Sequence, residues 1–77
     1  MGKKMIDKTI KIDLTKMPKS ILEEIKELER LNDIEDWFSY DLKFYELESN
    51  SKGYVIRKQI SESDYKKLMI KYGGYYD

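Results

Sequence analysis

The segment from Ile34 to Leu47 constrains the fold of this chain more than any other. Eight of its fourteen residues are apolar or aromatic. It also holds five of the ten aromatic residues of the chain, which are Trp37, Phe38, Tyr40, Phe44 and Tyr45. A helix through this segment is apolar on most of its circumference, which is typical of a buried central helix. Because a chain of 77 residues has little body to bury such a helix, we expect either the spine of a small bundle or a helix covered in part by a second molecule.

Hydrophobic periodicity predicts a helix on each side of the boundary near Asn32 and Asp33. The first covers residues 18–32, where Ser20 and Glu23 match a capping box and Pro18 suits a first turn. The second covers residues 34–57. Residues 50–53 are poor helix formers, so this helix either breaks there or, as we favour, continues in weakened form.

A third helix is predicted over residues 61–72. Ser61 suits the N-cap position, and Asp64 stands at the third helical position as in a capping box. Gly73 is placed to end the helix in a left-handed conformation. Residues 73–77 then form a short tail.

The N-terminal segment, residues 1–16, reads as a strand or an extended arm. Ile10, Ile12 and Leu14 alternate with polar residues, which is the period of a half-buried strand. Such a strand needs an edge to join, either residues 54–56 or a second chain, and the fold would then be α+β. We therefore predict one small, mostly α domain over residues 1–77, with three helices and an N-terminal strand or arm.

The chain has no cysteine and no histidine. Thiolate and imidazole chemistry is therefore excluded, together with the zinc and haem sites that depend on it. No Asp-rich loop has the spacing of a calcium site. We accordingly expect no catalytic residues, no metal and no cofactor, and we interpret the protein as not being an enzyme.

Composition suggests a source and a location. Alanine is absent, lysine outnumbers arginine thirteen to two, and there are nine isoleucines, which indicates an AT-rich genome of a low-GC bacterium. Small accessory proteins of phages and mobile elements, including inhibitors and regulators, have this character. No pattern of a signal peptide or membrane span appears, so we expect a cytoplasmic protein without a membrane partner.

Charges are segregated although the formal net charge is zero. Residues 1–19 carry six Lys against two Asp, residues 20–50 carry three basic against ten acidic residues, and residues 51–77 carry six basic against three acidic residues. Either the basic ends fold back on the acidic middle or the acidic face meets a basic partner.

We predict protein–protein interaction without catalysis, of a regulator or inhibitor type. The partner is a larger protein of unknown identity, and a homodimer is a second possibility. Trp and Tyr dominate binding hot spots because they bury large areas at low entropic cost. The predicted contact surface on the second helix consists of aromatic anchors and acidic neighbours: Trp37, Tyr40, Phe44, Asp33, Glu35 and Asp36.

Two alternatives use charge instead of aromatic anchors. A basic face with interleaved tyrosines would bind nucleic acid through Arg57, Lys66, Lys67 and Lys71, although a neutral chain favours this less. An acidic face could imitate DNA and inhibit a DNA-binding protein. Its charges would be Glu23, Glu27, Asp33, Glu35, Asp36 and Glu46.

Overall fold

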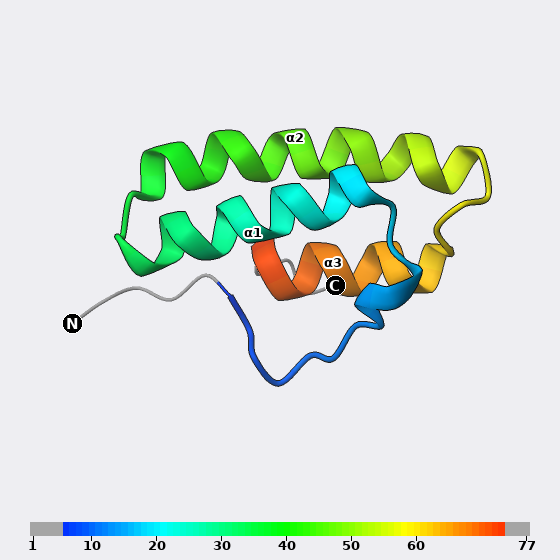
Figure 1. Cartoon of the computed structure of the whole chain (residues 1–77), viewed down its shortest axis with the longest axis horizontal. Coiled ribbons are helices and arrows are strands. Elements are labelled where there is room, and N and C mark those ends of the chain that lie inside the picture. Colours follow the sequence, from blue (N-terminus) through cyan, green and yellow to red (C-terminus); the bar gives the residue numbers. More distant parts are fainter. Residues whose placement is uncertain (1–5, 74–77) are drawn as a thin grey trace.

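A computed structural model describes residues 6–73 of the chain. A short 3₁₀ helix, η1 (Leu14–Lys16), precedes α1 (Lys19–Asp33), α2 (Trp37–Ile56) and α3 (Glu62–Gly73). Figure 1 shows α2 running the length of the molecule on one side, with α1 and α3 packed beneath it. The mostly α, three-helix prediction is confirmed. The predicted strand is not found among the described residues, and residues 1–5 and the tail beyond Gly73 lie outside them.

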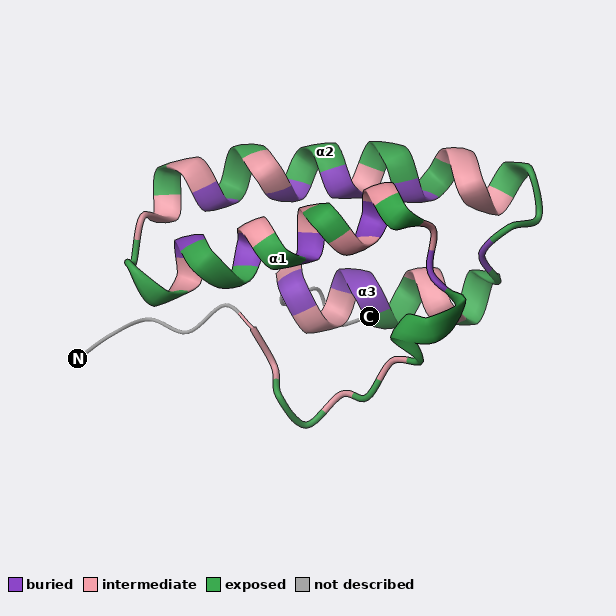
Figure 2. Cartoon of the chain, viewed as in Figure 1, coloured by how far each residue is buried: buried purple, intermediate pink, exposed green. Residues whose placement is uncertain are grey.

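The core lies between the three helices. Figure 2 shows that each helix turns its buried residues towards the other two. The partly buried Trp37, Tyr54 and Tyr65 close the edges of this core. Its buried members are Met17, Ile21, Ile25, Leu28 and Leu31, then Tyr40, Phe44 and Leu47, and finally Ile60, Leu68, Met69 and Tyr72.

The turn between α1 and α2 is closed by backbone hydrogen bonds. The amide of Asp36 donates to the carbonyl of Leu31 at 3.0 Å, and that of Glu35 donates to Asn32 at 3.2 Å. This is the Schellman pattern, in which the residue after the helix is left-handed. Glu35 has φ 57°, a conformation that glycine usually supplies. Nothing in its side chain predicts that position.

The turn after α2 has the same Schellman pattern of hydrogen bonds. The amide of Gln59 donates to Tyr54 at 2.8 Å, that of Lys58 donates to Val55 at 2.9 Å, and Lys58 has φ 63°. Between Trp37 and Ile56 the helix runs without a break. The continuous form of this helix is therefore the one observed, with Gly53 inside it.

Two of the predicted helix ends need correction. At α1, Pro18 is the N-cap residue and no side chain caps the helix. The hydroxyl of Ser20 instead forms a 2.7 Å hydrogen bond with that of Tyr54 and ties α1 to α2. Gly73 is the last residue of α3, and a Cβ added there would stand 2.8 Å from the Cε atoms of Phe44. Glycine is needed there because the ring packs against its backbone.

The predicted cap of α3 matches the structure. The amide of Asp64 donates to the hydroxyl of Ser61 at 3.1 Å. Ile60, directly before the cap, is buried. Local sequence thus determines where α3 starts, because a capping hydrogen bond needs only residues that are close together in the chain.

Residues 6–13 form an arm that crosses α3 instead of a strand. The amide of Asp7 donates to the carbonyl of Lys71 at 2.7 Å. In return the ammonium of Lys71 donates to the carbonyls of Asp7 at 3.1 Å and Ile10 at 2.7 Å. Pairing with residues 54–56 is not available to the arm, because those residues belong to α2. The strand prediction is therefore wrong for the described part of the arm, and the arm prediction holds.

Candidate protein-binding surface

α2 carries a second apolar face that points away from the core. Phe38 is 77% exposed, Leu42 52%, Tyr45 56% and Ile56 80%. At 3.6 residues per turn these four side chains fall on one side of the helix. We call them the outer stripe. Ile34, 58% exposed, extends it at the α1–α2 turn.

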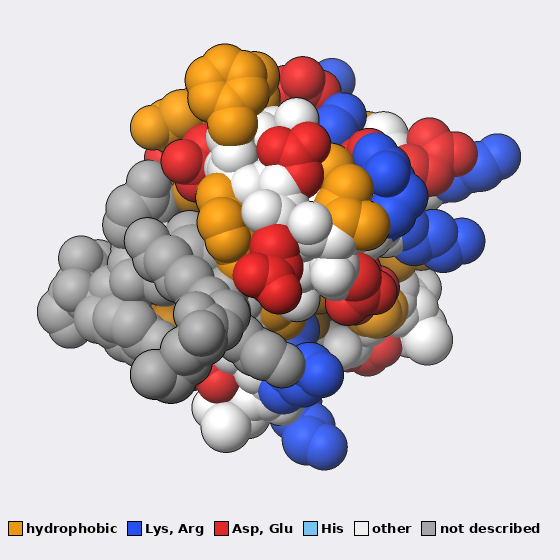
Figure 3. Space-filling view, turned by 90° about the vertical axis from the view of Figure 1, so that its left-hand side faces the viewer, with side chains coloured by type: hydrophobic (Ala, Val, Ile, Leu, Met, Phe, Trp, Pro, Cys, Tyr) orange, Lys and Arg blue, Asp and Glu red, His pale blue; other side chains and the backbone are white. Residues whose placement is uncertain are grey.

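Clustered exposure of large apolar side chains is uncommon in monomers. Single apolar residues on a surface are normal, whereas contiguous patches mark interaction sites. The side of α2 opposite α1 and α3 is largely exposed in Figure 2. Figure 3 views the end formed by the α1–α2 turn and shows hydrophobic side chains at the top, over α2, with acidic side chains among and below them.

Polar residues border the outer stripe, and the sign of their charge changes along the helix. Asp41 and Glu46 are exposed beside its first half, and Ser49 and Lys52 are exposed in its second half. The ammonium of Lys43 contacts the Glu46 carboxylate at 3.1 Å. Lys52 lies only loosely against Glu48, at 3.9 Å. The stripe is therefore acidic near its start and basic near its end.

Two of the predicted aromatic anchors lie in the core. Tyr40 is 0% exposed and Phe44 is 4% exposed. The hydroxyl of Tyr40 donates to the carbonyl of Tyr72 at 2.6 Å, and burial raises the pKa of this phenol. The prediction that Tyr40 and Phe44 touch a partner is wrong in this fold, because both complete the packing of α2 on α3.

The other predicted contact residues gather at the α1–α2 turn. Trp37 is partly buried, and its ring meets that of Tyr40 edge-on at 5.8 Å. Asp36 caps α2 by accepting a hydrogen bond from the amide of Ser39 at 3.2 Å. Asp33 and Glu35 are exposed. These two acidic residues therefore remain accessible beside the start of the outer stripe.

The basic set predicted for nucleic acid is only partly free. Lys71 is held by the carbonyls of the N-terminal arm. The guanidinium of Arg57 lies 4.8 Å from the centre of the Tyr54 ring. Lys66 and Lys67 are exposed on α3. Two of the four predicted phosphate contacts, Lys71 and Arg57, therefore have partners within the chain.

The acidic set predicted for DNA mimicry is also partly compensated. Glu27 pairs with Arg30 through two hydrogen bonds, and the hydrogen bond from Arg30 lowers the pKa of Glu27. Glu46 pairs with Lys43. Two of the six charges thus have basic neighbours on their own helix.

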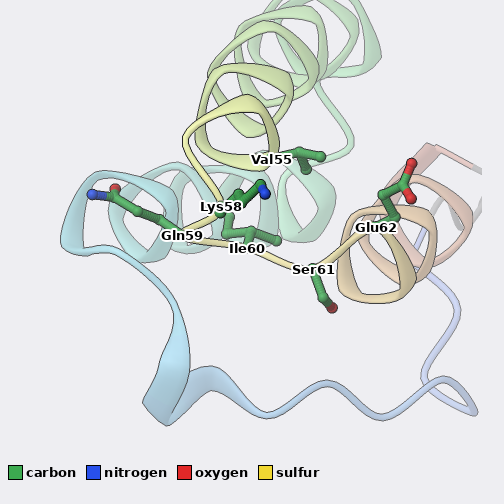
Figure 4. Close-up of a pocket in the computed structure, with 6 residues that line it drawn as sticks. All are labelled: Val55, Lys58, Gln59, Ile60, Ser61 and Glu62. Atoms are coloured by element: carbon green, nitrogen blue, oxygen red, sulfur yellow. The ribbon is translucent and has the colours of Figure 1, made fainter.

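A hollow of about 430 Å³ lies at the turn between α2 and α3. Figure 4 shows that its labelled side chains fan outwards and do not converge on one point. A catalytic or ligand site needs polar groups that meet within hydrogen-bond reach. The hollow offers no such arrangement. Its lining residues are Val55, Lys58, Gln59, Ile60, Ser61 and Glu62.

Residues 6–73 contain neither a candidate metal site nor a helix that could span a membrane. Within this range no group of three or more acidic side chains is placed to hold a metal ion. None of the described helices combines the length and apolar character needed to cross a membrane. None of the family models, curated proteins and solved structures compared with this chain matches it.

The outer stripe was not predicted as a unit. The predicted contact surface included Trp37 and Phe44, which lie in or against the core. The available signal was the spacing of Phe38, Leu42 and Tyr45 at positions i, i+4 and i+7, which is itself an amphipathic pattern. Two such patterns overlap in α2, and only packing against α1 shows which one is inside.

Proposed function

We propose that this chain is a non-enzymatic protein-binding module of the regulator or inhibitor type, which docks through the outer stripe of α2. The observation that carries the proposal is the exposure of Phe38, Leu42, Tyr45 and Ile56 on one side of a single helix. Each of these side chains loses contact with water when a partner covers it, at roughly 25 cal/mol per Å² of apolar surface.

The geometry suits the helix-in-groove mode of recognition. In this mode, a helix lays apolar anchors at i, i+4 and i+7 into an apolar groove of its partner. α2 is well prepared for this role, because its inner face and its Asp36 cap already hold it in helical form. The ordering cost that a disordered peptide meets on binding is therefore small here.

The acidic residues beside the outer stripe indicate which charges the partner should carry. Asp33, Glu35 and Asp41 are exposed near the first half of the stripe. Basic residues around the corresponding part of the groove would speed association and penalise acidic partners. An acidic groove or a phosphate backbone would be repelled there.

Affinity capture tests the proposal. Tagged protein is incubated with a lysate of a low-GC bacterium, with and without nuclease, and captured proteins are quantified by mass spectrometry. Leu42→Ser is compared with Leu14→Ser, which alters a leucine of similar exposure on η1. We expect a stoichiometric protein that survives nuclease and is lost only with Leu42→Ser.

Two outcomes would contradict the proposal. Capture that collapses on nuclease treatment, or that weakens steeply with added salt, would indicate nucleic-acid binding instead. Equal capture by both leucine variants would remove the outer stripe as the contact surface. Circular dichroism of each variant establishes that the fold is retained in every arm.

A further inference from the structure

The outer stripe has matching ends. Phe38 and Ile56 are eighteen positions apart, which is about five full turns, so the two side chains leave the helix in the same direction. They are also the two most exposed of the large apolar side chains described, at 77% and 80%. Leu47, at the centre between them, lies on the opposite, buried side. The stripe is therefore balanced about the middle of α2.

Opposite charges occupy matching places on one edge of this stripe. Asp41 and Lys52 are eleven positions apart, about three turns, and so share an edge of the helix. Along the axis they are separated by about 16 Å, which is too far for a direct ion pair within one chain. Their midpoint falls within one residue of Leu47, as does that of Phe38 and Ile56.

Two α2 helices placed antiparallel about a two-fold axis at Leu47 complement one another. In such a pair, each residue before the centre meets, on the same edge, the residue equally far beyond the centre of the partner. Phe38 then contacts Ile56 of the other copy, and Asp41 contacts Lys52. Both contacts occur twice, because an interface of this symmetry repeats every pair.

The remaining positions fit the same register. Leu42 faces Gly53 of the other copy, where the missing side chain leaves room for it. A Cβ built at Gly53 would lie 3.8 Å from a guanidinium nitrogen of Arg57, which is an ordinary van der Waals contact, so this position is not crowded. Tyr45 faces Ser49, a small exposed residue. Large side chains thus meet small ones across the contact.

Parallel pairing would lose this complementarity. It would bring residues of equal height together, so Asp41 could not reach Lys52 of the other copy, about 16 Å away along the axis. The antiparallel arrangement also leaves α1 and α3 clear, since both lie on the far side of α2 (Figure 1).

We propose that the outer stripe binds a second copy of this chain, with the two α2 helices antiparallel and centred on Leu47. This inference rests on the proposed function and names the occupant of its surface. The contact consists of one helix face per chain, so it belongs with small interfaces, and we expect a dissociation constant on the order of micromolar.

Sedimentation velocity over a concentration series tests the dimer. The wild-type chain should pass from the monomer mass to twice that mass as concentration rises. Asp41→Lys and Lys52→Glu each turn both ion pairs of the dimer into repulsions, so each should weaken dimerisation roughly ten- to hundredfold. Glu23→Lys and Lys67→Glu, which change exposed charges on α1 and α3, are the matched controls and should behave as wild type.

Mixing the two weakened variants gives the decisive measurement. A heterodimer of Asp41→Lys with Lys52→Glu has opposite charges at both contacts, so an equimolar mixture should regain wild-type dimerisation. The double variant Asp41→Lys/Lys52→Glu should regain it on its own. Neither recovery can arise within one chain, because the two positions are about 16 Å apart.

The outcomes separate this inference from the proposed function. A wild-type chain that stays monomeric up to millimolar concentration overturns the dimer, and loss of capture by Leu42→Ser would then still support a different protein partner. Single variants that dimerise as well as wild type overturn the antiparallel register. Dimerisation that needs the outer stripe and recovers on mixing supports both proposals.

Discussion

The two faces of α2 contain the same kinds of residues and have opposite surroundings. The inner face carries Phe44, Tyr40 and Ser51, and all three are buried. The outer face carries Phe38, Tyr45 and Ser49, and all three are exposed. Residue type alone therefore does not decide which face is core. The difference lies in the neighbours, because α1 and α3 cover only one side of the helix (Figure 1).

Residues of the same type in these different surroundings can be substituted in pairs to test this comparison. In each pair, one substitution is made where the core packs and the same substitution is made on the outer side of α2; in the glycine pair the core position, Gly73, belongs to α3. Stability is measured by urea denaturation at a concentration low enough to keep the chain monomeric, so that binding does not contribute.

The phenylalanine pair should show the largest contrast. Phe44→Ala removes a buried ring and leaves a cavity, which costs about 3–5 kcal/mol of unfolding free energy. Small domains have total stabilities of about 5–15 kcal/mol, so this variant loses a large share. Phe38→Ala should change stability by less than about 0.5 kcal/mol. Similar losses in both variants would show that the outer face is also packed within the chain.

The tyrosine pair tests a single buried hydrogen bond. Tyr40→Phe leaves the carbonyl of Tyr72 without its 2.6 Å donor, which should cost about 1–3 kcal/mol. Tyr45→Phe removes an exposed hydroxyl and should be neutral within about 0.5 kcal/mol. A neutral Tyr40→Phe would show that water or another donor replaces the lost bond.

Alkaline pH extends the same test. Burial raises the pKa of Tyr72 to about 12 and raises that of Tyr40 as well, whereas an unfolded tyrosine titrates near about 10. The folded state thus holds protons that the unfolded state releases, so stability is complete below pH about 10 and falls as pH rises towards 12. Tyr40→Phe should reduce the steepness of this fall, and Tyr45→Phe should not.

The glycine pair should give effects of opposite sign. In Gly73→Ala the new methyl group would meet the Phe44 ring, 2.8 Å from its Cε atoms. Because that ring is buried in the core, we expect a loss of about 1–2 kcal/mol. In Gly53→Ala the new methyl group makes only an ordinary contact, 3.8 Å from the Arg57 guanidinium, and the helix gains propensity, so the substitution should add about 0.5–1 kcal/mol. Stabilisation by both substitutions would mean that Phe44 can move.

The serine pair should show the smallest effect. Ser51 is fully buried, and its hydroxyl has no hydrogen-bond partner among residues 6–73. Ser51→Ala therefore removes a desolvated polar group and should stabilise the fold by up to about 1 kcal/mol. Ser49→Ala changes only helix propensity, so the free energy of unfolding should change by roughly a few tenths of a kcal/mol. If Ser51→Ala instead lowered the stability, the Ser51 hydroxyl would have to form a hydrogen bond in solution.

Local signals in the sequence predicted some elements well. The Ser61 cap matched because a capping hydrogen bond needs only neighbouring residues. The helical periods of residues 18–32 and 61–72 identified α1 and α3 to within two residues at each end. Those helices have one apolar side each, so their pattern admits one orientation.

Signals failed where distant residues compete for the same group. Ser20 had a capping pattern, yet its hydroxyl bonds to Tyr54, thirty-four positions away. The alternation at Ile10 and Ile12 suggested a strand, but the ammonium of Lys71 satisfies the carbonyl of Ile10. Glu35 and Lys58 take left-handed conformations, and no property of a charged side chain marks such a position.

The sequence by itself determined that the segment of α2 is a helix with apolar residues on most of its circumference, and that cysteine and histidine chemistry is absent. These conclusions follow from composition and from the 3.6-residue period, which are local properties. Tertiary structure alone decided that Tyr40 and Phe44 face inwards while Phe38, Leu42 and Tyr45 face outwards. Both arrangements are compatible with one helix, and the choice depends on where α1 and α3 pack.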